Sequence, residues 1–331
     1  MRNSNYQRIC SNLLKGLPQR TVDIIERRFG LRGEEPQTLE AIGQTYGRTR
    51  ERIRQIEEDG LLAVKEKLSD YKDVLEYFEK TLESFGGFKE EKELLEFLGG
   101  KKAKNHVFFL LTIAQNFNRS LEDNKFYSFW VKDKKSAKKA RSIVNSIINR
   151  FKKEKKPLSL KEILEKQKTD KNILLSSIGI SKEIEKNPEG KFGLKGWIEI
   201  NPRGIKDRAY LVLKREEKPL HFRDIANLID NLPFPSGRKS HIATVHNELI
   251  KDQRFVLVGR GLYALSEWGY RPGVVKDVIY QVLKEAKRPL TKKQILDKVL
   301  EQRFVKTGTI TLNLQNNDCF IKDNKGRYRI A

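Results

Sequence analysis

Apolar side chains recur at helical spacing twice between residues 38 and 57, first at Leu39, Ile42 and Tyr46 and then at Ile53 and Ile56. Gly47 separates the two groups, and glycine tolerates the left-handed backbone that ends a helix before a sharp turn. Thr38 and Thr49 stand where N-caps are expected, because a hydroxyl can accept a hydrogen bond from the free amides of a first helical turn. The pattern therefore predicts two short helices joined by a tight turn, which is a helix-turn-helix.

The start of the second helix carries a cluster of polar side chains, namely Arg48, Thr49, Arg50, Glu51, Arg52, Arg54 and Gln55. A helix-turn-helix places this part of its second helix in the major groove of DNA. Arginine pairs with guanine, glutamate accepts from the amino group of cytosine, and glutamine can bridge adenine. A charged helix face that meets only solvent is the alternative interpretation of the same residues.

The segment Thr49-Arg-Glu-Arg-Ile-Arg-Gln-Ile-Glu57 resembles the fourth conserved region of bacterial primary sigma factors. The upstream segments Leu17-Pro-Gln-Arg20, Arg28-Phe-Gly-Leu31 and Thr38-Leu-Glu-Ala-Ile-Gly43 resemble it as well, so that the likeness extends over about residues 10 to 70. In that family this region reads the minus-35 promoter element and docks on RNA polymerase. The resemblance implies that Arg50, Glu51 and Gln55 read bases. It places the remaining residues of the cluster toward the DNA backbone or a protein partner, and these are Arg48, Thr49, Arg52 and Arg54.

Further along the chain, one pattern recurs three times, marked by a basic residue and Pro-Leu at Pro157, Pro219 and Pro289. A helical pattern precedes each proline, and Ser, His or Thr two residues later can cap a second helix. A third apolar segment follows, and then a strand–turn–strand with glycine or asparagine at the turn. Three helices followed by a two-stranded wing are the elements of a winged helix. Residues 72–131 fit a divergent copy, with a hairpin near residues 122–125.

These patterns predict a mainly α-helical chain in which an N-terminal helix-turn-helix is followed by tandem winged-helix modules with small β-hairpin wings. The predicted divisions are 1–70 for the sigma region 4-like part, 71–135 for the divergent winged helix, 136–204 for a winged helix with a basic N-terminal segment, 205–271 for a third and 272–331 for a fourth.

The third module also resembles the HARE type of winged helix-turn-helix. The residues that carry this resemblance are Lys218-Pro-Leu-His-Phe-Arg-Asp-Ile-Ala226, Thr244-Val-His-Asn-Glu-Leu249 and Phe255-Val-Leu-Val-Gly-Arg-Gly-Leu-Tyr-Ala-Leu265. The resemblance implies a DNA-associated or protein-docking module. Gly259-Arg260-Gly261 lies between two predicted strands, which indicates a wing tip from which Arg260 reaches a minor groove or a phosphate.

The charge of the chain favours a polyanionic partner, because its 331 residues have a formal net charge of +23 and a pI near 9.8. An apolar run of membrane-spanning length and a signal peptide are both lacking, so we expect nucleic acid rather than a membrane as the partner, and the cytoplasm as the location. Residues 1–70 contain 13 Lys or Arg and 11 Asp or Glu. Residues 132–171 contain 15 and 5, and this segment is expected to be a basic linker between modules. Its lysines either form only a soluble surface or contact phosphates.

Residues that could support catalysis or a metal site do not form recognisable patterns. Cys10 and Cys319 stand at opposite ends of the chain, and His241 and His246 are five residues apart, which is not the spacing of a shared metal. Glu154-Lys155-Lys156 has the form of a nuclease motif but lies in a lysine-rich segment. The sequence therefore predicts no metal, no cofactor, no small-molecule substrate and no enzymatic activity.

The function favoured by the sequence is that of a bacterial transcription initiation factor or regulator, which binds promoter DNA and the RNA polymerase core and lacks a promoter-melting domain. An adaptor that binds RNA polymerase, or an anti-sigma-like competitor, is the second hypothesis. A non-specific nucleoid-associated protein is the third.

Overall fold

The computed structural model describes residues 5–167, 169–234 and 239–331 of the chain, which divides into two compact units. The first unit contains Met1–Lys186 with Gly190–Lys195, and the second contains Asn187–Glu189 with Gly196–Ala331. Helices predominate in both units, and the strands form small antiparallel sheets, as the sequence predicts. Among the described residues, none of the helices has the length and apolar character needed to cross a membrane.

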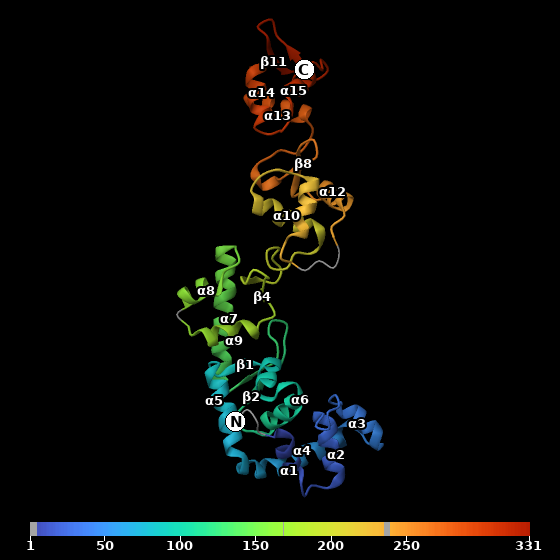
Figure 1. Ribbon diagram of the computed structural model, residues 1–331, viewed down its shortest axis with the longest axis vertical. Helices are drawn as coiled ribbons and strands as arrows, with labels where there is room; N and C mark the ends of the chain where they lie inside the picture. The colour runs from blue at the N-terminus through green and yellow to red at the C-terminus, as the bar shows by residue number, and fades with distance from the viewer. Residues whose placement is uncertain (1–4, 168, 235–238) are drawn as a thin grey trace. The chain divides into compact units, whose positions relative to one another are not determined.

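The first four helices form the predicted helix-turn-helix and its support, and they are α1 (Tyr6–Leu14), α2 (Gln19–Phe29), α3 (Leu39–Tyr46) and α4 (Arg50–Glu66). The expected caps are present, because the Thr38 hydroxyl accepts from the Ala41 amide at 3.2 Å and the Thr49 hydroxyl from the Arg52 amide at 3.3 Å. Gly47 ends α3 in the left-handed conformation, with φ of 57°. These helices are drawn in blue near the N-terminus in Figure 1.

Two glycines in this bundle allow close approach of the backbone. A Cβ on Gly43 would lie 2.6 Å from the carbonyl oxygen of Arg48, in the turn between α3 and α4. A Cβ on Gly60 would lie 2.4 Å from Cγ2 of Thr21, where α4 crosses α2. The small core of the helix-turn-helix is centred on Ile24, Ile42 and Ile53, none of which is exposed.

A first winged helix follows directly, with η1 (Lys67–Tyr71), α5 (Lys72–Ser84), β1 (Phe88–Glu90), α6 (Glu91–Ile113), β2 (Asn118–Ser120) and β3 (Phe129–Val131). The sheet order is β1-β3-β2, and Phe88 pairs with Val131. Gly100, with φ of 58°, divides α6 into two helical parts. The order of elements is therefore helix, strand, helix, helix, strand, strand, as in a winged helix, and the predicted hairpin lies between β2 and β3.

The division expected near residue 70 falls inside η1, and the helices on both sides of it contribute to one hydrophobic core. The second half of α6 packs against α1, α2 and α4. Its Val107 and Phe109 are fully buried, and the Phe109 ring meets the Phe29 ring edge-on with centroids 5.0 Å apart. The helix-turn-helix and the first winged helix therefore share their interior.

The second winged helix contains α7 (Lys134–Glu154), α8 (Leu160–Gln167), α9 (Lys171–Gly179), β4 (Ile184–Lys186) and β5 (Phe192–Leu194). The prediction of a basic linker at residues 132–171 is wrong, because most of this segment is helical. The Asp133 carboxylate caps α7 by accepting from the Ser136 amide at 2.6 Å, and Val144, Ile147 and Phe151 bury one side of the helix. The lysines of this segment are therefore side chains of a packed helix.

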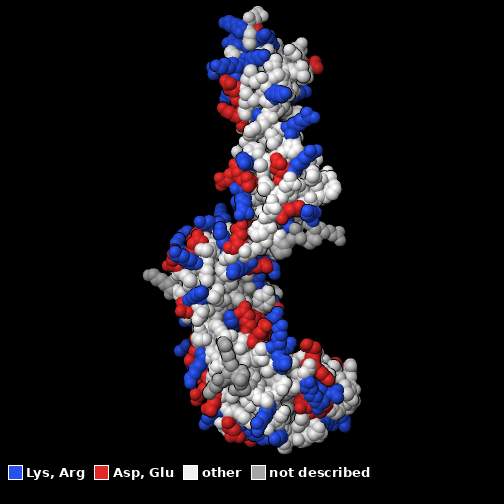
Figure 2. Space-filling view, viewed as in Figure 1, with Lys and Arg blue, Asp and Glu red and all other residues white. Residues whose placement is uncertain are grey.

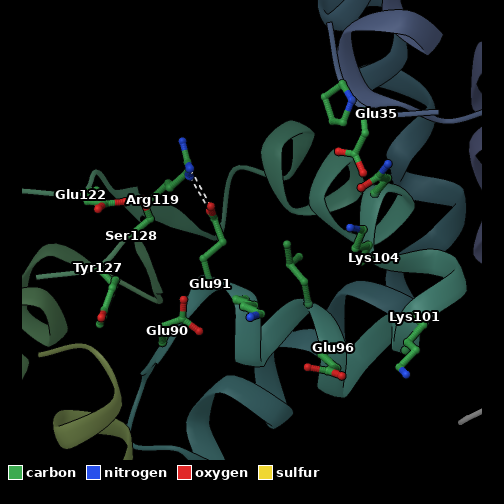
Figure 3. A pocket seen from close by; sticks show the side chains of 15 residues that line it. Glu35, Glu90, Glu91, Glu96, Lys101, Lys104, Arg119, Glu122, Tyr127 and Ser128 are labelled. Carbon is green, nitrogen blue, oxygen red and sulfur yellow. Dashed lines mark hydrogen bonds and ion pairs between the residues drawn. The ribbon is translucent and has the colours of Figure 1, made fainter. Parts of the chain in front are cut away.

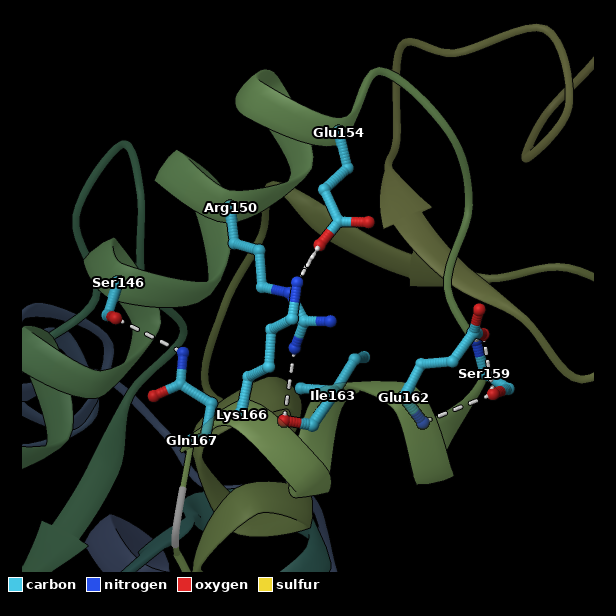
Figure 4. A network of polar contacts seen from close by, with 8 residues as sticks. All are labelled: Ser146, Arg150, Glu154, Ser159, Glu162, Ile163, Lys166 and Gln167. Carbon is cyan, nitrogen blue, oxygen red and sulfur yellow. Dashed lines mark hydrogen bonds and ion pairs between the residues drawn. The ribbon is translucent and has the colours of Figure 1, made fainter.

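A polar network fixes α8 against α7 (Figure 4). The Arg150 guanidinium donates to the Glu154 carboxylate at 3.0 Å and to the carbonyl oxygen of Ile163 at 3.2 Å. The Gln167 amide donates to the Ser146 hydroxyl at 3.1 Å. These contacts join the end of α7 to α8, so the two helices form one support.

The second unit holds two further winged helices. The third is formed by α10 (Gly204–Glu216), β6 (Leu220–His221), α11 (Phe222–Asp230), α12 (Ile242–Lys251), β7 (Phe255–Gly259) and β8 (Leu262–Leu265), followed by η2 (Ser266–Trp268). The fourth is formed by α13 (Val275–Ala286), β9 (Leu290–Thr291), α14 (Lys292–Leu300), α15 (Thr307–Leu314), β10 (Phe320–Lys322) and β11 (Arg327–Ile330). Their sheets have the orders β6-β8-β7 and β9-β11-β10, which is the topology of the first winged helix.

The residues after each Pro-Leu marker cap a helix as predicted. The Ser159 and Thr291 hydroxyls each accept an amide three residues later at 3.3 Å, and Nδ1 of His221 accepts the Arg223 amide at 3.3 Å. The leucine of the marker has a role that the sequence did not indicate. Leu158 forms a bridge with Phe192, and Leu220 and Leu290 lie in β6 and β9. Each marker therefore supplies the short first strand of its sheet.

The third and fourth winged helices are joined by a defined contact. The Phe304 amide donates to the carbonyl oxygen of Val258 at 2.7 Å, which adds a strand-like pairing to β7. Beside it, the buried Arg303 guanidinium donates to the carbonyl oxygens of Arg271 and Gly273 at 2.5 and 2.9 Å. We call the contacts made by Arg303 and Phe304 the inter-wing joint.

Candidate nucleic-acid interface

The polar cluster at the start of α4 lies on the surface, as expected for a reading helix. Arg50, Glu51, Arg52 and Gln55 are exposed, whereas Ile53 is fully buried in the helix-turn-helix core. Arg48 and Thr49 are exposed in the turn before the helix, and Arg54 is half-buried. The structure thus brings all seven residues of the cluster to one helix end and its turn.

Within this cluster, several side chains pair with one another along the helix. The Arg54 guanidinium contacts both carboxylate oxygens of Glu51, at 2.7 and 3.0 Å, and also pairs with Glu58. The hydrogen bond from Arg54 holds the pKa of Glu51 below its ordinary value, so this carboxylate is ionised at neutral pH. Arg52 donates to the Gln55 side-chain oxygen at 3.1 Å.

The three proposed base-reading residues differ in the contacts that their side chains make within the helix. Among the described residues the Arg50 guanidinium has no hydrogen-bond or ion-pair partner, so it is available to a ligand, and its charge helps to lower the pKa of Glu51. The oxygens of Glu51 and Gln55 already accept from Arg54 and Arg52, so a base would share or replace these partners. Exposed pairs on a helix surface contribute little to stability, so this exchange is not a large barrier.

The position of α4 relative to α3 is set by the turn. The Arg48 amide donates to the carbonyl oxygen of Gly43 at 2.9 Å, and the Cβ that Gly43 lacks would collide with the carbonyl oxygen of Arg48. The two helices therefore approach within backbone contact, and the direction of α4 follows from this approach.

A polar hub centred on Asp23 holds the helix-turn-helix together, and no pattern in the sequence predicts it. Its carboxylate accepts from the Tyr46 hydroxyl at 2.6 Å and contacts Arg27 and Arg32 at 2.8 Å each. Burial acts to raise the pKa of Asp23, but the hydrogen bonds from Tyr46 and Arg32 and the charge of Arg27 outweigh it and lower the pKa. Because Tyr46 lies 23 residues away, no local pattern could have paired the two.

A second polar contact links α2 to α4 on the inner side. Burial raises the pKa of Glu57, and the Arg28 guanidinium, with Nε at 3.4 Å, opposes that effect. Arg28 also donates to the carbonyl oxygen of Gln37 at 3.1 Å, in the loop that precedes α3. Arg28 and Glu57 are therefore positioning residues, and neither faces outward with the polar cluster.

Arg260 lies apart from this cluster, in the second compact unit. It is exposed in the turn between β7 and β8, which is the wing tip that the sequence predicted for it. Gly261 has φ of 72°, and a Cβ there would lie 2.5 Å from the His221 ring. The glycine thus lets the wing turn tightly over the start of α11.

A protein-family model described as "Sigma-70, region 4" matches residues 13–66, from the end of α1 to the end of α4. Residues 13–66 form a sigma-70 region 4-like domain. Among curated proteins, the RNA polymerase principal sigma factor HrdD of Streptomyces viridifaciens is 44% identical to this chain over 59 residues. That of Streptomyces griseus is 42% identical over 59 residues. In each case the match covers 18% of this chain and 18% of the relative.

These likenesses support a DNA-binding, sigma-like role in transcription for the region 4-like domain. The family match ends at Glu66, where α4 ends. The family match therefore includes the polar cluster at the start of α4. It does not include any of the winged helices.

A hollow of about 760 Å³ lies between the region 4-like domain and the first winged helix (Figure 3). Glu35 lines one side, α6 forms another, and Arg119 pairs with both carboxylate oxygens of Glu91 within it. Several glutamates line the hollow. Even so, among the described residues no three His, Cys, Asp or Glu side chains converge in a way that could hold a metal. Its charges are of both signs and partly paired, so it does not match one class of ligand.

Charge is distributed very unevenly between the parts of the chain. Residues 1–131 contain 22 Lys or Arg and 21 Asp or Glu, so nearly all of the excess positive charge lies in residues 132–331. In Figure 2 both signs of charge are interspersed over the region 4-like domain, whereas Lys and Arg gather on the fourth winged helix. Any non-specific electrostatic attraction to DNA would therefore come mostly from residues 132–331.

Proposed function

We propose that the chain is a transcription initiation factor or regulator that recognises a minus-35-like promoter element through its region 4-like domain and contacts RNA polymerase. The observation that carries this proposal is the exposed polar cluster at the start of α4, in a domain whose family match includes the complete helix-turn-helix. The proposed mechanism is binding without a catalytic step. It needs no cofactor and no small-molecule substrate.

In this mechanism some residues of α4 contact DNA bases and others contact the phosphates of the DNA backbone. Arg50 is free to pair with a guanine, and Glu51 and Gln55 reach cytosine or adenine after they release Arg54 and Arg52. The released arginines then have phosphates as partners, so the exchange on the helix replaces one charged contact by another. Arg48 and Thr49, which are exposed in the turn before α4, would contact the DNA backbone at the edge of the same groove.

The test is the effect of Arg50→Ala on the discrimination between a preferred site and a scrambled duplex. We expect a loss of about 1–3 kcal/mol on the preferred site, which is about 5- to 150-fold in Kd, and relaxed base preference at one position. The preferred site is first selected from a random duplex library with the full-length protein. Lys101→Ala, at an exposed site on α6, is a matched control that removes one positive charge elsewhere in the same unit. Equal losses on all sequences would overturn the base-reading role.

An adaptor that binds RNA polymerase is the second candidate, and the balanced charge of residues 1–131 favours it. The structure limits how such a partner could dock. The apolar faces of α1, α2 and the end of α4 are covered by α6, so a polymerase subunit would have to use another face or displace α6. Capture of RNA polymerase from a nuclease-treated lysate that survives Arg50→Ala would support the adaptor.

A non-specific nucleoid-associated protein is the third candidate, because of the net charge of +23. It predicts a steep dependence of affinity on salt and equal binding of all duplexes. The same measurement of selected and scrambled duplexes therefore separates it from the promoter-reading proposal.

A further inference from the structure

The third helix of a winged helix is the element that would enter the major groove, and in the first winged helix this element is occupied. The second half of α6, residues 101–113, lies in the core shared with the region 4-like domain. Its Asn105 side chain donates to the carbonyl oxygen of Gly30 at 3.0 Å, and the carbonyl oxygen of His106 accepts from the buried Cys10 thiol. This helix cannot enter a groove without dismantling that core.

The third helix of the second winged helix is occupied as well. α9 packs against β1 of the first winged helix, where a Cβ on Gly86 would lie 2.5 Å from the Ile173 side chain. The Tyr127 amide donates to the carbonyl oxygen of Ile180 at 3.0 Å, just after α9. Leu174 is fully buried. The first two winged helices thus use their third helices as internal supports in a chain of contacts that ends at the region 4-like domain.

The third helices of the second unit are open along one side. In α12, Val245 and Leu249 are buried, while Ile250 is 62% exposed. In α15, Ile310 and Leu314 are buried, while Leu312 is 69% exposed. Thr307 and Thr309 of α15 are exposed as well. Among the described residues these two are therefore the winged-helix elements with an available outer face.

Charge distinguishes these two modules. Residues 272–331 contain 13 Lys or Arg and 6 Asp or Glu, whereas residues 205–271 contain 12 and 8. The wing of the fourth module is strongly basic, since Lys322, Lys325 and Arg329 are exposed on β10, β11 and the turn between them. α15 itself has no charged residue, and its threonines can hydrogen-bond to base edges or contact a thymine methyl. An uncharged third helix beside a cationic wing matches duplex DNA better than it matches an acidic protein.

We propose that the fourth winged helix is a second DNA contact of this chain. In this proposal α15 faces the major groove, and Lys322, Lys325 and Arg329 neutralise phosphates. The first two winged helices do not contact DNA through their third helices. The proposal rests on the proposed DNA-binding function. It assigns to the wing of the fourth module the non-specific attraction to DNA that the nearly neutral residues 1–131 do not supply.

The test compares two triple variants of the full-length chain by the slope of log Kd against log salt on a scrambled duplex. Lys322→Ala/Lys325→Ala/Arg329→Ala should reduce the magnitude of this slope by about 2 to 3, because each phosphate contact contributes about 0.9. The matched control is Lys101→Ala/Lys102→Ala/Lys104→Ala, which removes three exposed charges from the start of the occupied third helix of the first winged helix. The control should leave the slope unchanged.

An unchanged slope in the wing variant, or an equal loss in both variants, would overturn the proposal. Thermal melting of each variant shows whether the fold survives, and Thr309→Asp provides a second test that leaves the wing intact by placing a negative charge on the outer face of α15. Weaker duplex binding by Thr309→Asp supports the proposal, and unchanged binding opposes it. If Arg50→Ala does not alter discrimination while the wing variant loses its slope, the promoter-reading function fails and the wing contact stands. The reverse pattern has the opposite meaning.

Discussion

Replacing Gly43 with alanine tests whether the tight turn between α3 and α4 positions α4, the helix proposed to read bases. The added Cβ would lie 2.6 Å from the carbonyl oxygen of Arg48, where ordinary contacts begin at 3.4 Å. The obstructing atom belongs to the backbone, so it cannot rotate aside as a side chain could. Overpacking of this kind costs about 1–3 kcal/mol, and the better helix propensity of alanine offsets about 1 kcal/mol. We expect the free energy of opening of α2–α4 to fall by about 0–2 kcal/mol, toward the upper end because a backbone atom must move.

Hydrogen exchange measured by mass spectrometry on peptides from residues 19–66 is the appropriate assay, because it reports this segment separately from the winged helices. Gly47 offers a contrast four residues away, since a Cβ there would meet no atom within 4 Å, while its φ of 57° disfavours side chains. Asparagine adopts this left-handed conformation more readily than alanine does. Gly47→Asn should therefore cost less than Gly47→Ala, whereas Gly43→Asn should cost more than Gly43→Ala. The opposite order at position 43, or wild-type exchange and DNA discrimination in Gly43→Ala, would refute the reasoning.

Two further predictions concern the hub and the shared core. Asp23→Asn should destabilise the region 4-like domain by about 1–2 kcal/mol at neutral pH, because charged hydrogen bonds to Tyr46 and Arg32 are lost. The native pKa of Asp23 is lowered, so its contribution is present above the pKa of the unfolded chain and is lost as pH falls through the native pKa. Urea unfolding at pH 7 and near pH 3 should thus show a smaller effect of the substitution in acid, with exposed Asp59→Asn as control. Phe109→Ala should cost about 3–5 kcal/mol and accelerate hydrogen exchange in α1, α2 and residues 88–131 together. Loss of protection in only one of these segments would contradict a common core.

The sequence was informative where structure depends on neighbours along the chain. Residues at helical spacing, two threonine caps and one glycine were enough to predict the helix-turn-helix, since each of these signals acts within a few residues. The Pro-Leu markers indicated the repeated modules for the same reason. The HARE resemblance of residues 205–271 and the divisions between modules remain predictions.

The sequence was less informative where structure depends on contacts between distant segments. The apolar run from Val107 to Ile113 indicates a helix buried on most sides, but not that α1 and α2 are its neighbours. The lysines between residues 134 and 139 indicate a linker, because they are more prominent in the sequence than the apolar residues that α7 buries. The role of Asp23 could not be predicted from the sequence, because Tyr46 and Arg32 become its partners only in the folded chain.

The inter-wing joint limits how the third and fourth winged helices can move relative to each other. The Phe304 amide ties the segment before α15 to β7, and the Arg303 guanidinium ties the same segment to the carbonyl oxygens of Arg271 and Gly273. The third and fourth winged helices therefore cannot swing independently without breaking those bonds. The start of α15 is therefore held beside the wing of the third winged helix. A duplex bound to α15 would then lie at a defined position relative to β7.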